Sequence, residues 1–203
     1  MRFFFATLLA SVAIAFTIPD GQPDGTYQVS IVNGKEVHTL ITLADNQRPR
    51  HNISDVAHSA KFARRGAAGE DYLVERQISG GNNAISCGGG ALNHGDTDAA
   101  NTALDRQCGS GANVGGGRDF YSIAGCTVAY FCNFRNYADM CFASERVATS
   151  AAITSNCGWY VTGWDTFSSS GGGGRYNSYG YENFCGTGSN FCGRGTSVTG
   201  SYW

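Results

Sequence analysis

The amino-acid sequence predicts an α+β fold, a disulfide-stabilised α/β sandwich with two helices on one face of a mainly antiparallel sheet. Three observations support this prediction. After residue 76, helical and strand-like segments follow each other in the order helix, strands, helix, strands. All eight cysteines of the 203-residue chain lie between Cys87 and Cys192. The 29 glycines cost backbone entropy and add no side-chain packing, so disulfides worth about 2–5 kcal/mol each would offset a small core.

The first residues have the pattern of a secretory signal peptide. One basic residue precedes an apolar run from Phe3 to Phe16, which contains the small-residue cleavage triplet Ala13-Ile14-Ala15. The run is shorter than the roughly 20 residues that a membrane-spanning helix requires. We therefore predict a signal peptide over residues 1–15, cut after Ala15, and a secreted, extracellular protein without stable membrane insertion. Export also favours disulfides over metal clusters for an even number of cysteines.

Residues 16–76 resemble the pro-region of a fungal prepropeptide. Arg64-Arg65 is a dibasic pair and Arg76 ends the sequence LVER, and kexin-type proteases cut after such basic sites. The one Asn-x-Ser/Thr sequon, at Asn52, also lies in this region and is a predicted glycosylation site. We expect cleavage after Arg65 or Arg76 to leave a cysteine-rich mature domain, residues 77–203. The alternative is a charged linker between two permanently joined domains.

Upstream of these sites, GTYQVSIVNGKEVHTLI predicts a β-hairpin. Tyr27, Val29 and Ile31 alternate along the first strand, and Asn33-Gly34 suits the positive φ angles of a type I′ turn. A hairpin alone is only marginally stable in water. It either docks on the downstream domain as an intramolecular chaperone or stays loosely ordered until it is removed, and the sequence leaves both open.

Two helices are predicted in the cysteine-rich domain. In DTDAANTALDRQCG, Asp96 or Thr97 is the expected N-cap, Gly109 is the stop, and a stripe at helical spacing faces inward: Ala100, Ala103, Leu104, Gln107 and Cys108. In CFASERVATSAAITSNCG, Ser144 is the expected N-cap, Glu145 favours the first turn and Gly158 ends the helix. Its expected inward stripe consists of small residues: Val147, Ala148, Ala151 and Ala152.

Strands are predicted between and after these helices. DFYSIAGCTVAYFCNF indicates two strands joined at Ala124-Gly125, because β-branched and aromatic residues flank a turn. Three further runs have the same composition: GWYVTGW, RYNSYGYENFC and TSVTGSYW.

All eight cysteines are expected in disulfides: Cys87, Cys108, Cys126, Cys132, Cys141, Cys157, Cys185 and Cys192. Cys126 and Cys132 share one face of a strand, which we expect to be buried, and lie about 20 Å apart, too far for a bridge. We expect at least one of the two to bond a helix-layer cysteine, Cys108, Cys141 or Cys157. Cys132 with Cys141 is the preferred pair. Cys185 could pair with Cys192 or instead with the cysteine of the first helix.

The stretch TVAYFCNF…MCFASERVATSAAITSNCG resembles the killer-toxin-like family of small secreted fungal proteins. An apolar strand ends at a cysteine, a Cys followed by Ser/Ala-x-Glu opens a helix, and Cys-Gly closes it before a Trp-containing strand. The resemblance extends over about Leu104 to Cys185 and more loosely to necrosis-inducing cysteine-rich effectors. It implies a disulfide-held α/β sandwich and a toxin or effector that binds its target through basic residues. Residues 77–203 contain no lysine, so Arg135 and Arg146 are the candidates for that role.

Two alternative interpretations are enzymatic or metal-dependent. His94, Asp96 and Asp98 have the residue types of a metal site, although a loop and a capped helix start explain them more simply. A small secreted ribonuclease would need a glutamate base and an arginine for the phosphate, and RYNSYGYENFCG contains three suitable residues: Arg175, Tyr179 and Glu182.

A third alternative is a carbohydrate-binding cell-wall protein. Aromatic side chains exposed on one sheet face would stack on sugar rings, and the candidates are Trp159, Tyr160, Trp164, Tyr176, Tyr179 and Tyr181. Core packing is the more common use of such residues.

The charge balance argues against a nucleic-acid partner. Residues 77–203 carry six arginines and eight acidic residues, whereas tracking a phosphate backbone requires a basic surface. Taken together, the sequence observations lead us to expect a non-enzymatic secreted monomer, with no cofactor or metal. Its expected partner is a protein or glycan on the surface of host or competitor cells.

Overall fold

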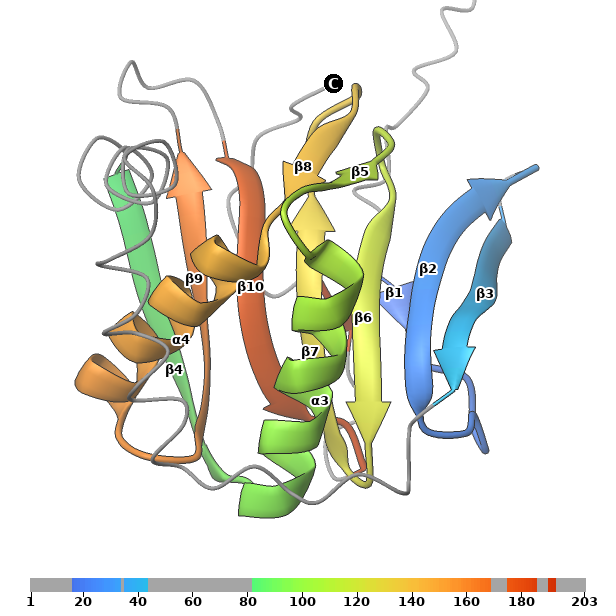
Figure 1. The fold of residues 1–203 in the computed structure, drawn as a ribbon. Helices are drawn as coiled ribbons and strands as arrows, with labels where there is room; N and C mark the ends of the chain where they lie inside the picture. The colour runs from blue at the N-terminus through green and yellow to red at the C-terminus, as the bar shows by residue number, and fades with distance from the viewer. Residues whose placement is uncertain (1–15, 34, 44–81, 169–174, 186–189, 193–203) are drawn as a thin grey trace, which may run out of the picture.

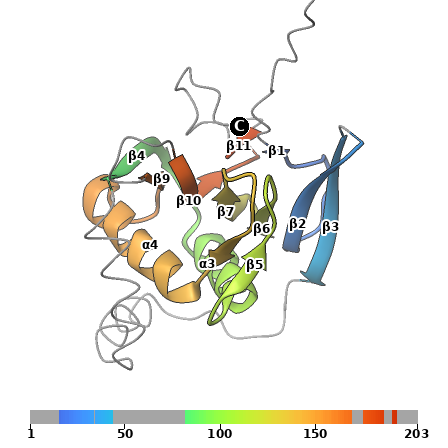
Figure 2. The ribbon, with the colours of Figure 1, turned by 90° about the horizontal axis from the view of Figure 1, so that it is seen from above.

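A computed structural model describes residues 16–33, 35–43, 82–168, 175–185 and 190–192. Two helices pack on a seven-stranded antiparallel sheet (Figure 1), so the predicted fold class is confirmed. Figure 2 shows α3 (His94–Cys108) and α4 (Ala143–Cys157) on one side of the sheet. The short strands β1 (Phe16–Thr17) and β11 (Asn190–Phe191) pair with each other on the opposite side.

The strands of the large sheet lie in the order β3 (Lys35–Leu43), β2 (Gly25–Val32), β6 (Asp119–Ala124), β7 (Thr127–Asn133), β10 (Arg175–Asn183), β9 (Val161–Ser168) and β4 (Asn82–Ala91). A second small pair joins β5 (Ala112–Val114) to β8 (Asp139–Cys141).

Most predicted strands are confirmed, as β6, β7, β9 and β10. The sequence did not predict β4, because its glycine-rich run lacks the residues typical of strands. The predicted strand TSVTGSYW lies outside the described residues.

The central strands β6 and β7 are buried along their whole length, so each face of the sheet supports a separate core. On the helix side, Leu104, Phe131 and Tyr179 belong to a cluster that α3 and α4 cover, the helix-side core. On the other side, Tyr121 and Val128 belong to a cluster that β1, β2 and β11 help to form, the far-side core. The second layer over the sheet explains why these strands lack a polar face.

The N-terminal hairpin is part of the large sheet. Asn33 has φ 53°, as the predicted turn requires, and β2 pairs with both β3 and β6. Of the two possibilities left open by the sequence, the structure therefore shows the docked one for the strands of the hairpin. The predicted signal peptide, its cleavage at Ala15, the processing sites Arg65 and Arg76, and Asn52 lie outside the described residues.

Helix α3 begins earlier than expected and buries three of the five residues of its predicted stripe, whereas Ala103 and Gln107 are only partly buried. Ala100, Leu104 and Cys108 are buried, and Gly109 caps the C-terminus through its N–H, which donates to Asp105 O at 2.8 Å. The predicted N-cap at Asp96 or Thr97 is wrong. Asn93 is the N-cap, and its side-chain oxygen accepts a hydrogen bond from the backbone N–H of Asp96 at 3.0 Å.

Helix α4 turns a different face inward from the one predicted. Its buried residues are Glu145, Arg146, Thr149, Ser150 and Ile153, whereas Ala151 of the predicted small-residue stripe is exposed. Ser144 is also not the N-cap, because that position belongs to Phe142, which makes no side-chain cap bond. The polar residues Glu145 and Arg146 can be buried because each has a hydrogen-bonding partner in the interior. Arg146 pairs with Asp105 of α3, and Glu145 accepts a hydrogen bond from Tyr179 of β10.

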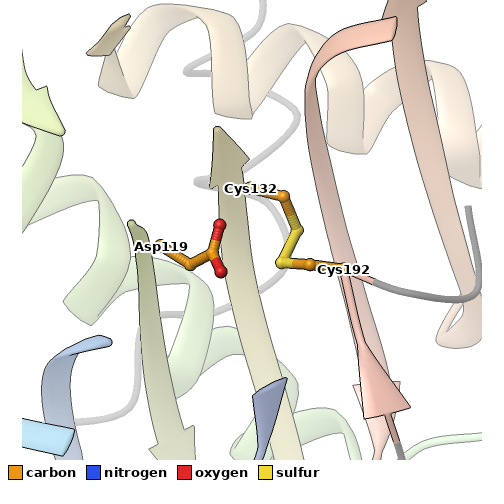
Figure 3. A group of neighbouring side chains, drawn as sticks. All are labelled: Asp119, Cys132 and Cys192. Atoms are coloured by element: carbon orange, nitrogen blue, oxygen red, sulfur yellow. A yellow bond between two sulfur atoms is a disulfide. The ribbon is translucent and has the colours of Figure 1, made fainter. Parts of the chain in front are cut away.

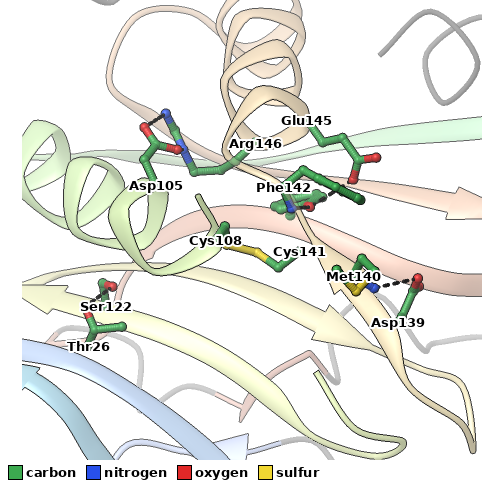
Figure 4. The surroundings of a disulfide bond; sticks show 11 residues. Thr26, Asp105, Cys108, Ser122, Asp139, Met140, Cys141, Phe142, Glu145 and Arg146 are labelled. Atoms are coloured by element: carbon green, nitrogen blue, oxygen red, sulfur yellow. Dashed lines mark hydrogen bonds and ion pairs between the residues drawn. A yellow bond between two sulfur atoms is a disulfide. The ribbon is translucent and has the colours of Figure 1, made fainter. Parts of the chain in front are cut away.

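All eight cysteines form disulfides: Cys87–Cys157, Cys108–Cys141, Cys126–Cys185 and Cys132–Cys192. The predicted pairs Cys132–Cys141 and Cys185–Cys192 are wrong, and so is the expectation that Cys126 or Cys132 bonds a helix-layer cysteine. Cys132 lies on the buried far-side face of β7, away from the helices. Cys108 and Cys141 join the end of α3 to β8 instead (Figure 4).

Four disulfides are typical of a protein made for an oxidising, extracellular environment. Among the described residues, neither helix has the length and apolar character needed to cross a membrane.

Candidate functional site: an exposed tryptophan turn

The acidic residues at the start of α3 serve the local structure. The backbone N–H of Asp96 donates to the Asn93 cap, and its carboxylate lies against Gly125, where an added Cβ would be 2.2 Å from Asp96 Oδ2. Asp98 accepts from the hydroxyl of Tyr160 at 3.3 Å. The capped helix start therefore explains these residues, and they are not gathered around a common point with His94.

One group among the described residues has side-chain atoms close enough to hold a metal ion. Asp119, Cys132 and Cys192 place their ligand atoms within 4.8 Å of one another. Figure 3 shows that the two sulfurs are bonded to each other, so neither is a free thiolate ligand. Burial raises the pKa of Asp119 to about 8, even though its Oδ1 accepts a hydrogen bond from the backbone N–H of Asn133 at 3.1 Å. The arrangement fits a protonated carboxyl beside a structural disulfide.

The residues suggested for a ribonuclease site are not brought together. Tyr179 is buried in the helix-side core, where its hydroxyl donates to Glu145 Oε2 at 3.0 Å. Glu182 is buried on the other face, where it accepts from Tyr130 Oη at 2.7 Å. Positions three apart on a strand point to opposite faces, so Tyr179 and Glu182 do not share a site. The side chain of Arg175 lies outside the described residues.

Arg146 does not fit its predicted role as a target-binding residue. Its guanidinium is buried against α3, where Nε and Nη2 both donate to the carboxylate of Asp105 (Figure 4). Nη1 donates to Ser150 Oγ at 2.8 Å. A bidentate pair of this kind orients two helices relative to each other. The resemblance to a basic binding motif did not predict this role because the motif contains no information about Asp105.

Arg135 remains close to the surface, at the end of β7. Its guanidinium carbon lies 4.6 Å from the ring centroid of Tyr176 and 5.1 Å from that of Tyr137, and Nε is 3.8 Å from Asp139 Oδ2. Tyr137, which the sequence analysis did not single out, is 59% exposed. An arginine held between aromatic rings is a preformed polar contact for a partner.

The aromatic residues suggested for sugar stacking do not form an exposed sheet face. Tyr160, Tyr179 and Tyr181 are buried, and Trp164 and Tyr176 are partly buried. Trp159 differs from the others, because it is 62% exposed. Among the described large hydrophobic residues that are exposed, it has the highest exposed fraction.

Trp159 is held outward by a tight connection between α4 and β9. Gly158 ends the helix with φ 103°, and Tyr160 has φ 53°, a left-handed conformation that is uncommon for a bulky residue. The Cys87–Cys157 disulfide anchors one side of the turn to β4. On the other side, the carbonyl of Tyr160 accepts from the N–H of Leu92 at 2.8 Å. A strained backbone that presents an apolar side chain to solvent is a feature of binding sites.

Two polar side chains complete this site, which we call the tryptophan turn: Trp159, Tyr160, His94 and Asp98. The exposed His94 ring stacks on Tyr160 with 3.8 Å between centroids, and the Trp159 and Tyr160 rings are 6.4 Å apart. Burial, with the adjacent Asp98 carboxylate, raises the pKa of Tyr160 to about 12. Burial likewise raises the pKa of Asp98.

The tryptophan turn offers chemistry for binding. It has an apolar indole face, an imidazole that can donate or accept a hydrogen bond, and a carboxyl group held by a neutral phenol. The turn lies at the start of β9, and Arg135 follows the end of β7. Strands β7 and β9 run in the same direction on either side of β10, so the two sites lie at opposite ends of the sheet.

Comparison of the chain with protein-family models, with curated proteins and with solved structures gives no match.

Proposed function

We propose that this protein is a secreted toxin- or effector-like protein that acts without catalysis, by binding a target on host or competitor cells. The observation that supports the proposal is the exposure of Trp159 on a turn held by a disulfide, a backbone hydrogen bond and a ring stack. Tryptophan is enriched among the residues that contribute most to binding energy. A backbone already held in place by these contacts loses little entropy on binding.

A cell-surface glycan is the second candidate for the target. The observation in its favour is that the exposed Trp159 indole and the exposed His94 imidazole both neighbour the Tyr160 ring, whose hydroxyl donates to the Asp98 carboxyl. Sugar rings present C–H groups to an aromatic face and hydroxyls to neighbouring polar groups. A protein target would use the same indole as an apolar anchor.

Replacing Trp159 with Ala is expected to weaken binding by roughly 30-fold or more, the loss typical of a dominant contact residue. The fold should be retained, because the indole is mostly exposed. The measurement is binding of fluorescently labelled protein to intact fungal cells and to plant leaf tissue side by side, with chitin and glucan pull-downs to identify a glycan target. Tyr137→Ala is the matched control, because it removes a similarly exposed aromatic at the opposite end of the sheet.

If the Trp159 variant binds as well as wild type and the Tyr137 variant loses binding, the binding site is Arg135 with its aromatic neighbours. If neither variant loses binding, neither of these two surfaces is the binding site. Incubation of the wild-type protein with RNA checks the enzymatic alternative, since cleavage that disappears in His94→Ala would contradict a non-enzymatic function.

A further inference from the structure

We propose that the secreted protein is a complex of two chains. After cleavage at Arg65 or Arg76, the segment Phe16–Leu43 stays bound as a noncovalent partner that completes the sheet of the cysteine-rich domain. The inference concerns the covalent state of the protein and is independent of the tryptophan turn. It replaces the expectation that processing leaves the cysteine-rich domain, residues 77–203, on its own.

The backbone of the N-terminal segment is paired with the cysteine-rich domain in two places. Strand β2 runs antiparallel to β6 from the pair Gly25–Ile123 to the pair Val29–Asp119. Strand β1 pairs with β11, with Phe16 opposite Phe191. Loss of the segment would leave β6 as an open edge, with unpaired N–H and C=O groups.

The side chains of the segment form much of the far-side core. Phe16 is fully buried, and its ring stacks on Tyr121 with centroids 4.9 Å apart. Tyr27 also stacks on Tyr121, at 5.2 Å, and Val29 and Ile18 are buried in the same cluster. Because Tyr121 is itself buried, removal of the segment would expose a contiguous aromatic and aliphatic surface.

Polar contacts set the register between the two parts. The hydroxyl of Tyr121 is 2.6 Å from Gln22 Nε2, which donates to it, and 2.7 Å from His38 Nδ1. The hydroxyls of Thr26 and Ser122 lie 2.8 Å apart in the buried interface. These contacts all join the segment to β6, so they favour one alignment of the strands.

No disulfide ties the segment to the rest of the chain, since all eight cysteines lie from Cys87 to Cys192 and pair among themselves. After a cut at Arg65 or Arg76 only noncovalent contacts would join the two parts. The predicted signal-peptide cut after Ala15 would make Phe16 the first residue of the secreted chain, so the buried anchor would be retained.

The test is a digest of the purified secreted full chain with a kexin-type protease. The products are separated by size exclusion in native buffer and in guanidinium chloride, without reducing agent. We expect two N-termini, Phe16 and either Gly66 or Gln77, in a single native peak. In guanidinium chloride the same sample should separate into two fragments, because no covalent bond joins them.

A native peak that contains the cysteine-rich fragment alone would overturn the proposal. So would a folded chain that resists the protease while the denatured chain is cut.

Two valine substitutions in the hairpin test the contact surface. Val29→Asp places a charge in the far-side core, where the side chain of Val29 is 2% exposed, and should weaken retention of the segment by at least about 100-fold. Val37→Asp, at a position 42% exposed on β3 of the same hairpin, is the matched control and should leave retention unchanged. Equal retention in both variants contradicts the interface. The wild-type digest decides the proposal even where Val29→Asp is not secreted, because the cut follows folding.

Discussion

Replacing Asp105 with Leu should lower the free energy of unfolding by about 3–5 kcal/mol, the range for an ion left buried without its partner. The side chain of Arg146 is 6% exposed, whereas that of Asp105 is 26% exposed. Without Asp105, Arg146 would keep only its hydrogen bond to Ser150. Arg146→Met should cost less, about 1–3 kcal/mol, because the remaining carboxylate reaches water.

The double variant Asp105→Leu/Arg146→Met should be close to wild type in stability, because apolar residues of similar size replace a buried pair without loss in several proteins. The measurement is urea unfolding of the four proteins of the double-mutant cycle, with disulfides intact. Arg106→Met is the matched control, since Arg106 is exposed in the last turn of α3, and its loss should cost no more than about 1 kcal/mol. Additive effects of the two single changes would show that the pair does not act as a unit.

The protein should be most stable in mildly acidic solution and lose stability as the pH rises toward 8. Burial raises the pKa of Glu145 from 4.5 to about 7, and that of Asp119 from 3.8 to about 8. Between the unfolded and the folded pKa the folded protein keeps these protons and the unfolded chain has released them. The folded state therefore binds more protons, and its stability falls with rising pH. Below the unfolded values both states are protonated and this dependence vanishes.

The shift of Glu145 alone corresponds to roughly 3 kcal/mol between the acidic plateau and pH 8, and Asp119 contributes with the same sign. The measurement is the urea midpoint over this pH range. Glu145→Gln should reduce the fall in stability and leave the part that Asp119 contributes, because a neutral amide no longer titrates but can still accept the hydrogen bond from Tyr179. Asp20→Asn, a change at an exposed position, should leave the profile as in wild type. A midpoint that rises from pH 5 to pH 8 would contradict the prediction.

Local patterns in the chain were sufficient for the elements whose neighbours in sequence are also their neighbours in space. The turn at Asn33 joins β2 to β3, and Gly125, with φ 54°, lies in the turn between β6 and β7 as the sequence predicted. The stripe of α3 was correct at Ala100, Leu104 and Cys108, because this helix packs an apolar face on the sheet. The fold class followed from the order of these elements.

The same patterns failed where both sides of an element can be buried. Alternation along β7 correctly placed Cys132 on a buried face, but β7 is buried on both faces, so alternation did not show which layer covers that cysteine. The partner proved to be Cys192, which reaches the far side with β11. In α4 the small residues suggested the inward face, whereas Arg146 is buried because Asp105 approaches it from another helix.

The candidate site likewise depends partly on local sequence and partly on contacts between distant residues. Composition gave Trp159 as one of six aromatic candidates and did not distinguish it from the other five. Its exposure depends on contacts from distant parts of the chain: Cys87 bonds Cys157, and His94 stacks on Tyr160. Local spacing predicts that a helix or strand forms and which of its residues share a face. Which faces meet, and which side chain is left in solvent, depends on contacts between residues far apart in the sequence, and periodicity contains no information about these.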